Sequence, residues 1–161
     1  MAHPTGYVIR TADAGDIATL VEHRELMFRE MGWECDYAAM AAHYGRWLVD
    51  VLPSGTYAGW VAVPNGEQTV VSSGGILVVP WTPGPHSMDP RCAWIVNVYT
   101  NAPHRKRGLA RRLMATMHDW CQAQGIERTA LNASAAGQPI YESMGYALAD
   151  EPMMRYRVQG F

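Results

Sequence analysis

Apolar residues recur at helical spacing in two segments within the first third of the chain. A first helix is predicted after Asp13, which suits an N-cap, and is expected to end at Gly32. Its apolar positions are Ile17, Leu20, Val21, Met27, Phe28 and Met31. A second helix is predicted from Asp36 and is expected to stop at the Pro-Ser-Gly run of residues 53–55. Its apolar positions are Met40, Tyr44, Trp47, Leu48 and Val51.

After residue 56 the pattern becomes that of β-strands. Residues 57–63 and 69–79 are rich in β-branched side chains, and Pro64-Asn65-Gly66 between them predicts a hairpin. Residues 80–90 hold several prolines and are expected to form a loop, because proline cannot donate a ladder hydrogen bond. Residues 93–100 predict a third long strand, apolar on both faces, which is typical of a buried central strand. A short strand at residues 8–10 is predicted before the first helix.

The last third of the chain alternates helices with short strands. A strong helix is predicted from about residue 107 to residue 124, followed by a strand at 129–133. A short helix at 139–144 and a last strand at 153–158 complete the pattern. This order of elements predicts an α/β fold with one mixed sheet flanked by helices, in a single domain covering residues 1–161.

Composition narrows the classes of function without pointing to a chemistry. The chain has 161 residues, of which 48% are hydrophobic and 17% charged, and a net charge of -2. These values are typical of a globular protein and disfavour a surface built to bind nucleic acid. No apolar run approaches the roughly 20 residues that span a bilayer. The start of the chain has no secretory-signal pattern and the three cysteines are scattered, so we expect a cytoplasmic protein. The six histidines show no metal spacing, so we expect no metal site.

The segment with the clearest chemistry joins the third long strand to the strong helix. Five of the 13 basic residues lie between positions 105 and 112, and no acidic residue lies between 104 and 118. A helix N-terminus offers unpaired N–H groups and a positive dipole end, which favour a phosphate. Gly108 and Ala110 leave room for a ligand near the backbone. Neither a Walker A loop nor a Rossmann glycine pattern is present, and a basic, solvated helix start is the simpler alternative.

Two motifs in this half of the chain resemble those of a known enzyme family. Arg105-x-x-Gly108-x-Ala110 resembles the acetyl-coenzyme A loop, Gln/Arg-x-x-Gly-x-Gly/Ala, of the GNAT superfamily of N-acetyltransferases. Residues 131–146 resemble the second block of that family, with Tyr141-Glu142 and Gly145-Tyr146 matching its pattern. Residues 154–155 also resemble its final strand, so the resemblance covers nearly the whole chain.

The resemblance implies acetyl-CoA as co-substrate and a set of residues that bind it. Val98, Tyr99 and Thr100 would bond the pantetheine arm through their backbone. The pyrophosphate loop would consist of Arg105, Lys106, Arg107, Gly108, Leu109 and Ala110, with Arg111 nearby. Ser134 would add a contact at the second block, although Ser134 and Gly137 stand where many members have Asn and Ala.

The resemblance also assigns a catalytic role to Tyr141. The amine must lose a proton to react, and the departing sulfur needs a donor, which a phenol with a pKa of about 10 can be. Tyr141 occupies the general-acid position of the family, the alternative being a core tyrosine, and a backbone N–H near Val98 would meet the oxyanion. The group that accepts the amine proton is not assigned. The candidates are a chain of water molecules and four side chains. These side chains are Glu22, Glu25, Glu30 and Tyr99.

The predicted function is an acetyl-CoA-dependent N-acetyltransferase that acts by direct attack in a ternary complex. The acceptor would be an amine of a small molecule or peptide, with Trp33 or Trp81 shaping its pocket. A non-catalytic acyl-CoA-binding module on the same fold is the alternative. A nucleic-acid binder is disfavoured because a strand, and not a helix-turn-helix partner, precedes the basic helix. The acceptor and a homodimer are left open.

Overall fold

Within residues 6–158, five strands form one sheet whose spatial order, β1-β2-β3-β4-β5, repeats their order along the chain. The computed structural model describes residues 6–158. The strands are β1 (Tyr7–Thr11), β2 (Tyr57–Pro64), β3 (Ser72–Pro80), β4 (Arg91–Thr100) and β5 (Thr129–Leu131). Neighbours from β1 to β4 are antiparallel, whereas β5 runs parallel to β4. The sheet is therefore mixed, as predicted.

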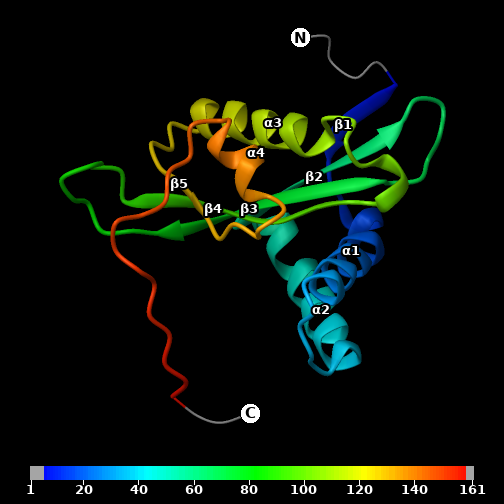
Figure 1. The fold of residues 1–161 in the computed structure, drawn as a ribbon, viewed down its shortest axis with the longest axis horizontal. Coiled ribbons are helices and arrows are strands. Elements are labelled where there is room, and N and C mark those ends of the chain that lie inside the picture. The colour runs from blue at the N-terminus through cyan, green and yellow to red at the C-terminus, as the bar shows by residue number, and fades with distance from the viewer. Residues whose placement is uncertain (1–5, 159–161) are drawn as a thin grey trace.

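Helices cover both faces of this sheet (Figure 1). Helices α1 (Ile17–Glu30) and α2 (Tyr37–Ser54) lie on one face, and α3 (Leu109–Ala123) and the short α4 (Gln138–Glu142) lie on the other. Single 3-10 turns at Ala14–Asp16 and Ala102–His104 precede α1 and α3. Among the described residues, no helix combines the length and the apolar character needed to cross a membrane. The α/β fold class and the flanking helices are confirmed.

The core consists of two apolar layers, one on each face of the sheet. Because successive side chains of a strand point to opposite faces, adjacent residues of β2 enter different layers. Trp60 belongs to the α3 layer, and Val61 belongs to the α1–α2 layer. Tyr57 is 1% exposed, and its hydroxyl occupies the place that a side chain at Gly75 would need, since a Cβ there would lie 2.0 Å from this oxygen. Gly75 is thus required for β2 and β3 to pack.

The predicted helix ends are largely confirmed. Asp13 accepts a hydrogen bond from the N–H of Gly15, and Asp16 bonds back to the N–H of Asp13, which makes a capping box. Two hydrogen bonds from Arg10 hold the pKa of Asp16 below its ordinary value. Helix α2 continues through Pro53 to Ser54 and ends at Gly55, whose φ is +74°.

Three expectations about the strands differ from the structure. The strand predicted at residues 153–158 is wrong, because this segment is exposed and pairs with no strand of residues 6–158. The hairpin exists, but residues 65–71 connect its strands and β3 begins only at Ser72. The long strand at 93–100 is part of β4, whereas the central position belongs to β3. A hydrophobic pattern cannot distinguish these neighbours, since it records burial and not the partner.

Candidate functional site

Strand β4 carries a bulge near its end. Ser73 pairs with Tyr99 and Gly75 with Val96, so two steps along β3 match three along β4. Within the bulge Asn97 has a φ of +58°, which few residues other than glycine adopt. Pairing between β4 and β5 ends just before it, at the Ile95–Leu131 pair. The backbone of β4 beyond Ile95, which includes the predicted Val98, Tyr99 and Thr100, is therefore not bonded to β5.

Side chains of α1 and α2 hold the bulge. Arg24 of α1 donates a hydrogen bond to the side-chain oxygen of Asn97, and the Asn97 amide donates to the Tyr44 hydroxyl at 2.8 Å. The Arg24 guanidinium also lies over the rings of Phe28 and Tyr44, 4.9 and 4.7 Å from their centroids. Arg24 and Tyr44 were not predicted as site residues. The only signal was a polar Asn97 inside an apolar strand.

This arrangement predicts two separable costs of replacing Asn97. Asn97→Gly removes both side-chain hydrogen bonds but permits the positive φ, so we expect a loss of about 1–3 kcal/mol in the free energy of unfolding. Asn97→Val also forces a β-branched residue into the left-handed region, which should cost about 1–2 kcal/mol more. Urea denaturation measures both values. Equal stability of the two variants would contradict the role given to the positive φ.

The turn between β4 and α3 exposes the start of the helix. Lys106 and Gly108 both have positive φ values, +60° and +75°. Helix α3 begins at Leu109 behind Gly108, no side chain of residues 6–158 caps it, and its first turn contains no acidic residue. The first N–H groups of a helix have no partner within it. The start of α3 therefore offers the backbone donors and the positive dipole end that fit a pyrophosphate.

The basic side chains of this turn are largely engaged by the protein itself. Arg105 points toward α1, where it contacts both carboxylate oxygens of Glu30 at 2.7 Å, and its Nε donates to the Thr100 carbonyl at 2.8 Å. Arg107 donates to the Tyr7 hydroxyl at 3.2 Å. Lys106 is exposed. Any phosphate held here would depend mainly on backbone N–H groups.

Arg111 connects α3 to α4. Its Nη1 donates to the Ser143 hydroxyl at 2.6 Å, and its Nη2 donates to the Ser143 carbonyl at 3.3 Å. Ser134 lies at the opposite end of α4, where its hydroxyl accepts from the N–H of Gly137 at 3.1 Å. Arg111 and Ser134, which were both predicted to contact the cofactor, thus also help to position α4.

The structure describes the four side chains considered as bases. Arg105 lowers the pKa of Glu30, which also accepts a hydrogen bond from the Tyr99 hydroxyl at 3.0 Å. Burial and the Glu30 carboxylate raise the pKa of Tyr99. Glu25 pairs with Arg29 at 2.7 Å. Glu30, whose pKa is lowered by Arg105, is therefore a weak proton acceptor, and Glu22 is exposed on α1.

A buried histidine lies next to the bulge. His23 is 2% exposed, its Nδ1 is 2.8 Å from the Ser73 hydroxyl, and its ring contacts that of Tyr99. Burial lowers the pKa of His23 to about 4, so the ring is neutral near pH 7. Sequence reasoning considered the histidines as metal ligands and His104 as a loop residue beside the cofactor, and it missed the position of His23. Within residues 6–158, no three His, Cys, Asp or Glu side chains are placed to hold a metal ion.

Tyr141 lies on α4 against the α3 layer of the core. Its ring packs edge-on against Tyr146, with 6.0 Å between centroids. A Cβ at Gly137 would lie 2.9 Å from the Tyr141 ring, so the glycine admits the tyrosine. Burial raises the pKa of Tyr141, which keeps its hydroxyl protonated. This hydroxyl forms no hydrogen bond with the described residues, and it is therefore available as a donor.

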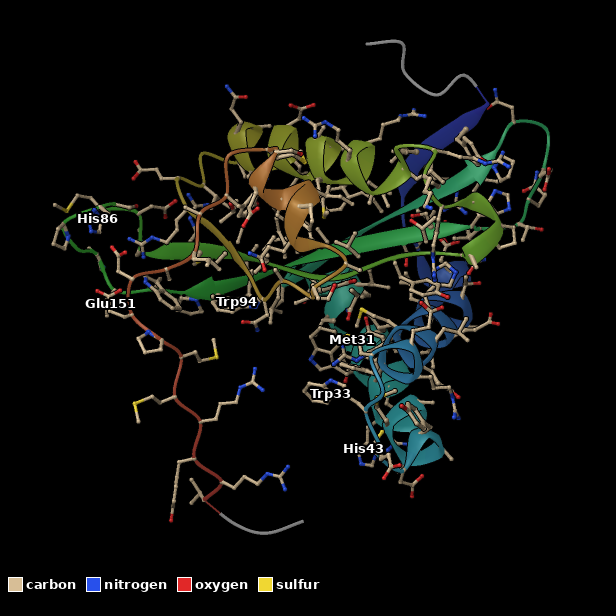
Figure 2. The ribbon with its side chains drawn as sticks, viewed as in Figure 1. Met31, Trp33, His43, His86, Trp94 and Glu151 are labelled. Carbon is tan, nitrogen blue, oxygen red and sulfur yellow. The ribbon has the colours of Figure 1, made fainter. Side chains whose placement is uncertain are left out.

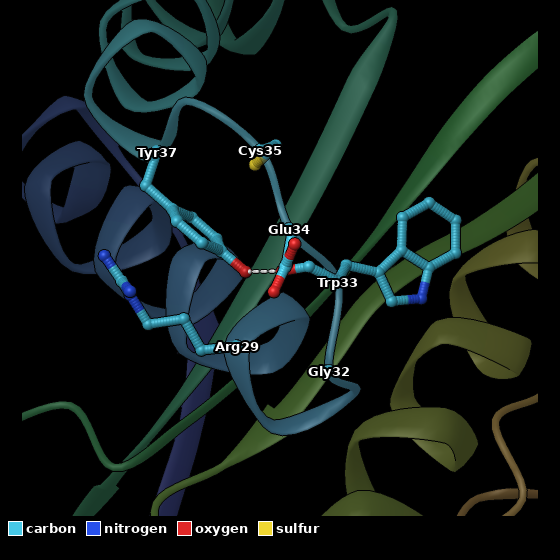
Figure 3. Close-up of a pocket in the computed structure, with 6 residues that line it drawn as sticks. All are labelled: Arg29, Gly32, Trp33, Glu34, Cys35 and Tyr37. Atoms are coloured by element: carbon cyan, nitrogen blue, oxygen red, sulfur yellow. Dashed lines mark hydrogen bonds between the residues drawn. The ribbon is translucent and has the colours of Figure 1, made fainter.

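The two tryptophans considered for an acceptor pocket lie far apart in the sheet architecture. Trp33, 52% exposed, lies in the α1–α2 connection against Phe28 and borders a pocket of about 330 Å³ (Figure 3). The Tyr37 hydroxyl closes this connection by donating to the Trp33 carbonyl. Trp81 instead lies next to Trp94, with tilted rings whose centroids are 6.3 Å apart, and Trp94 lies away from Trp33 (Figure 2). Because Trp94 alternates with Ile95 and shares the face of Val96, it lies on the face that carries α1 and α2, at a place separate from Trp33.

Comparisons with known proteins identify the family and the fold of the chain. The family model for the acetyltransferase (GNAT) family matches residues 18–146. A GCN5-related N-acetyltransferase from Ralstonia eutropha JMP134 shares 31% identity at a TM-score of 0.86, over 94% of this chain and 99% of that one. A predicted acetyltransferase from Clostridium acetobutylicum, solved with acetyl-CoA, shares 23% identity at a TM-score of 0.85, over 93% and 96%. An aminoglycoside N-acetyltransferase in complex with CoA shares 15% identity and the fold at a TM-score of 0.67, over 95% of each chain. The comparison with curated proteins finds no match.

Proposed function

The chain belongs to the GNAT family of acetyltransferases, and from this membership we propose that it transfers the acetyl group of acetyl-CoA to an amine of a small molecule or peptide. The observation that carries the proposal is the uncapped start of α3 behind Gly108. It lies directly after the bulged end of β4, whose backbone is free of β5. A helix start suited to phosphate and a strand end that is open on its β5 side thus follow one another, as an extended nucleotide thioester requires.

Each residue of the site has a distinct task in this proposal. When bound, acetyl-CoA supplies an electrophilic thioester and a thiolate leaving group. The N–H groups at Gly108–Arg111 hold the pyrophosphate, and the backbone of Val98–Thr100 lies along the pantetheine arm. A backbone N–H near Val98 stabilises the oxyanion, and Tyr141 donates a hydrogen bond to the departing sulfur. The amine approaches from the face of α1 and α2 and attacks the thioester carbonyl carbon directly in a ternary complex. Its proton passes to water, the carbon–sulfur bond breaks, and CoA leaves.

Acetyl-CoA is expected to stabilise the native protein. A ligand that binds only the folded state adds about 2.7 kcal/mol at a concentration of 100 times its Kd, so the melting temperature should rise by several degrees. Differential scanning fluorimetry with acetyl-CoA, and with duplex DNA as the comparison ligand, measures the shift. A rise with DNA but none with millimolar acetyl-CoA would overturn the proposed function.

Turnover separates the enzyme from a non-catalytic acyl-CoA-binding module on the same fold. Release of free CoA should be measured with amino sugars and aminoglycosides, polyamines, amino acids and peptide N-termini as acceptors. An enzyme releases CoA in proportion to one acceptor class, and the acetylated amine appears in the mass spectrum. Binding without release for every class would favour the non-catalytic module.

A further inference from the structure

Arg24 of α1 is a half-buried cation that has no counter-ion among the described residues. Two other arginines near the site are neutralised, Arg29 by Glu25 and Arg105 by Glu30, each at 2.7 Å. Arg24 forms an ion pair with no carboxylate of the described chain. Charged side chains are seldom withdrawn from water without a partner. The described structure therefore leaves a positive charge uncompensated on the face of the sheet that carries α1 and α2 (Figure 1).

The guanidinium of Arg24 is held in a fixed orientation. It lies over the rings of Phe28 and Tyr44, 4.9 and 4.7 Å from their centroids, and its Nη1 donates to the side-chain oxygen of Asn97. A guanidinium presents several N–H donors, and within the described chain only Nη1 of Arg24 has an acceptor. Arginine stacked on aromatic rings is weakly hydrated, and its planar fork matches a carboxylate. The remaining donors of Arg24 therefore suit a planar oxyanion.

The position of Arg24 relates these donors to the reacting atoms. Its partner Asn97 directly precedes Val98, near which a backbone N–H stabilises the oxyanion in the proposed reaction. The amine approaches from the face of α1 and α2 in that reaction, and Arg24 belongs to α1. An anionic group bound by Arg24 would therefore lie beside the amine. In an α-amino acid the amine and the carboxylate are bonded to the same carbon, so one molecule can place both groups.

We propose that the acceptor is an α-amino acid whose carboxylate binds the Arg24 guanidinium, an inference that rests on the proposed function. The amine nitrogen forms a bond with the acetyl carbon, the carbon–sulfur bond breaks, and the amine proton passes to water. The products are an N-acetyl amino acid and CoA. Polyamines, aminoglycosides and peptide N-termini have no carboxylate on the carbon that carries the amine, so they would leave Arg24 uncompensated.

Acceptor pairs that differ by the carboxylate test this specificity. The pairs are phenylalanine and phenethylamine, leucine and isoamylamine, and lysine and cadaverine. Because the two amines of a pair differ in pKa, the measured quantity is the kcat/KM ratio within a pair, compared between wild type and variant. Arg24→Gln should lower this ratio by about 10–100-fold for the amino acid that the enzyme uses best, since a hydrogen bond to a charged group is lost. Equal losses for both members of each pair would make Arg24 a support of the bulge alone and overturn the proposal.

Two further variants separate the contact from the charge. Arg24→Lys keeps the positive charge but lacks the planar fork, so it should keep only part of the preference for the carboxylate. Arg46→Gln is the matched control, because it removes the charge of an exposed α2 residue that has no described contact with the bulge, and it should leave every ratio unchanged. Far-ultraviolet circular dichroism checks that each variant folds. If Arg46→Gln lowers the ratio as much as Arg24→Gln, the preference arises from the general field of the protein, which contradicts a contact with Arg24.

Binding of the acetylated products tests the same contact without turnover. Isothermal titration calorimetry of the CoA-bound protein compares N-acetylphenylalanine with N-acetylphenethylamine, and likewise the products of the other two pairs. A carboxylated product should bind more tightly than its partner, and Arg24→Gln should abolish the difference. No preference for the carboxylate in any pair overturns this inference. A protein that binds no acetyl-CoA overturns the proposed function instead, so the two failures are distinguishable.

Discussion

Gly108→Glu is expected to weaken acetyl-CoA binding by on the order of 100-fold, equivalent to about 2.7 kcal/mol, while the protein remains folded. The substitution places a negative charge at the start of α3, where the helix dipole and backbone donors otherwise favour a phosphate. It also places a side chain on a residue whose φ is +75°. Gly108 is exposed and lies in the turn before α3, outside the buried core. Isothermal titration calorimetry with CoA measures the loss.

Gly55→Glu is the matched control for backbone strain. Gly55 has a φ of +74°, ends α2 and has no atom within 4 Å of an added Cβ. It should lower stability about as much as Gly108→Glu but leave CoA binding unchanged. Gly108→Asn provides the second comparison, because asparagine tolerates positive φ and carries no charge. If all three variants bind CoA like the wild type, the phosphates do not bind at the start of α3.

The sequence predicted the start of α3 well because its signals are local. Gly108, Ala110 and the lack of nearby acids lie within a few residues of one another, and the conformation they favour needs no distant partner. The order of helices and strands was predictable for the same reason, since periodicity is a property of single segments. The catalytic role of Tyr141 was inferred from a short sequence motif.

The pairings that give the site its electrostatics could not be predicted in this way. Glu30 and Arg105 are 75 positions apart, and Arg24 and Asn97 are 73 apart. Each partner alone has the pattern of an exposed charge or a strand polar group, so only the fold reveals that they meet. The sequence does not predict the bulge either, because it is a mismatch in the pairing of β3 with β4.

The strand wrongly predicted at residues 153–158 shows that a local pattern alone does not decide whether a strand forms. Alternation of Met154, Arg155, Tyr156, Arg157 and Val158 favours an extended, two-faced strand, which is a local property. Whether a strand forms depends on a neighbour that completes its hydrogen bonds, and residues 6–158 supply none. The pattern therefore describes a capacity of this segment, and the described residues supply no strand with which it could pair.

Tyr141→Phe is expected to lower kcat by about 10²–10⁴-fold and to leave CoA affinity nearly unchanged. The variant keeps the ring, and therefore its packing on the core and against Tyr146. It removes only the hydroxyl, which burial keeps protonated by raising the pKa of Tyr141. A free thiol has a pKa of about 8.5, so a phenol with a higher pKa acts on the departing sulfur chiefly as a hydrogen-bond donor. That role places the effect in the lower part of the range.

Tyr146→Phe is the matched control on the neighbouring ring. It makes the same chemical change but removes the hydrogen bonds to His118 and Thr129, so it should lower the free energy of unfolding by about 1–3 kcal/mol and change kcat little. A catalytic Tyr141 predicts the opposite pattern, a large loss of kcat with little loss of stability. Rapid-quench kinetics with a verified acceptor separate the chemical step from product release. If the chemical step of Tyr141→Phe stays within about twofold of the wild type, Tyr141 is a packing residue and another group must stabilise the departing sulfur.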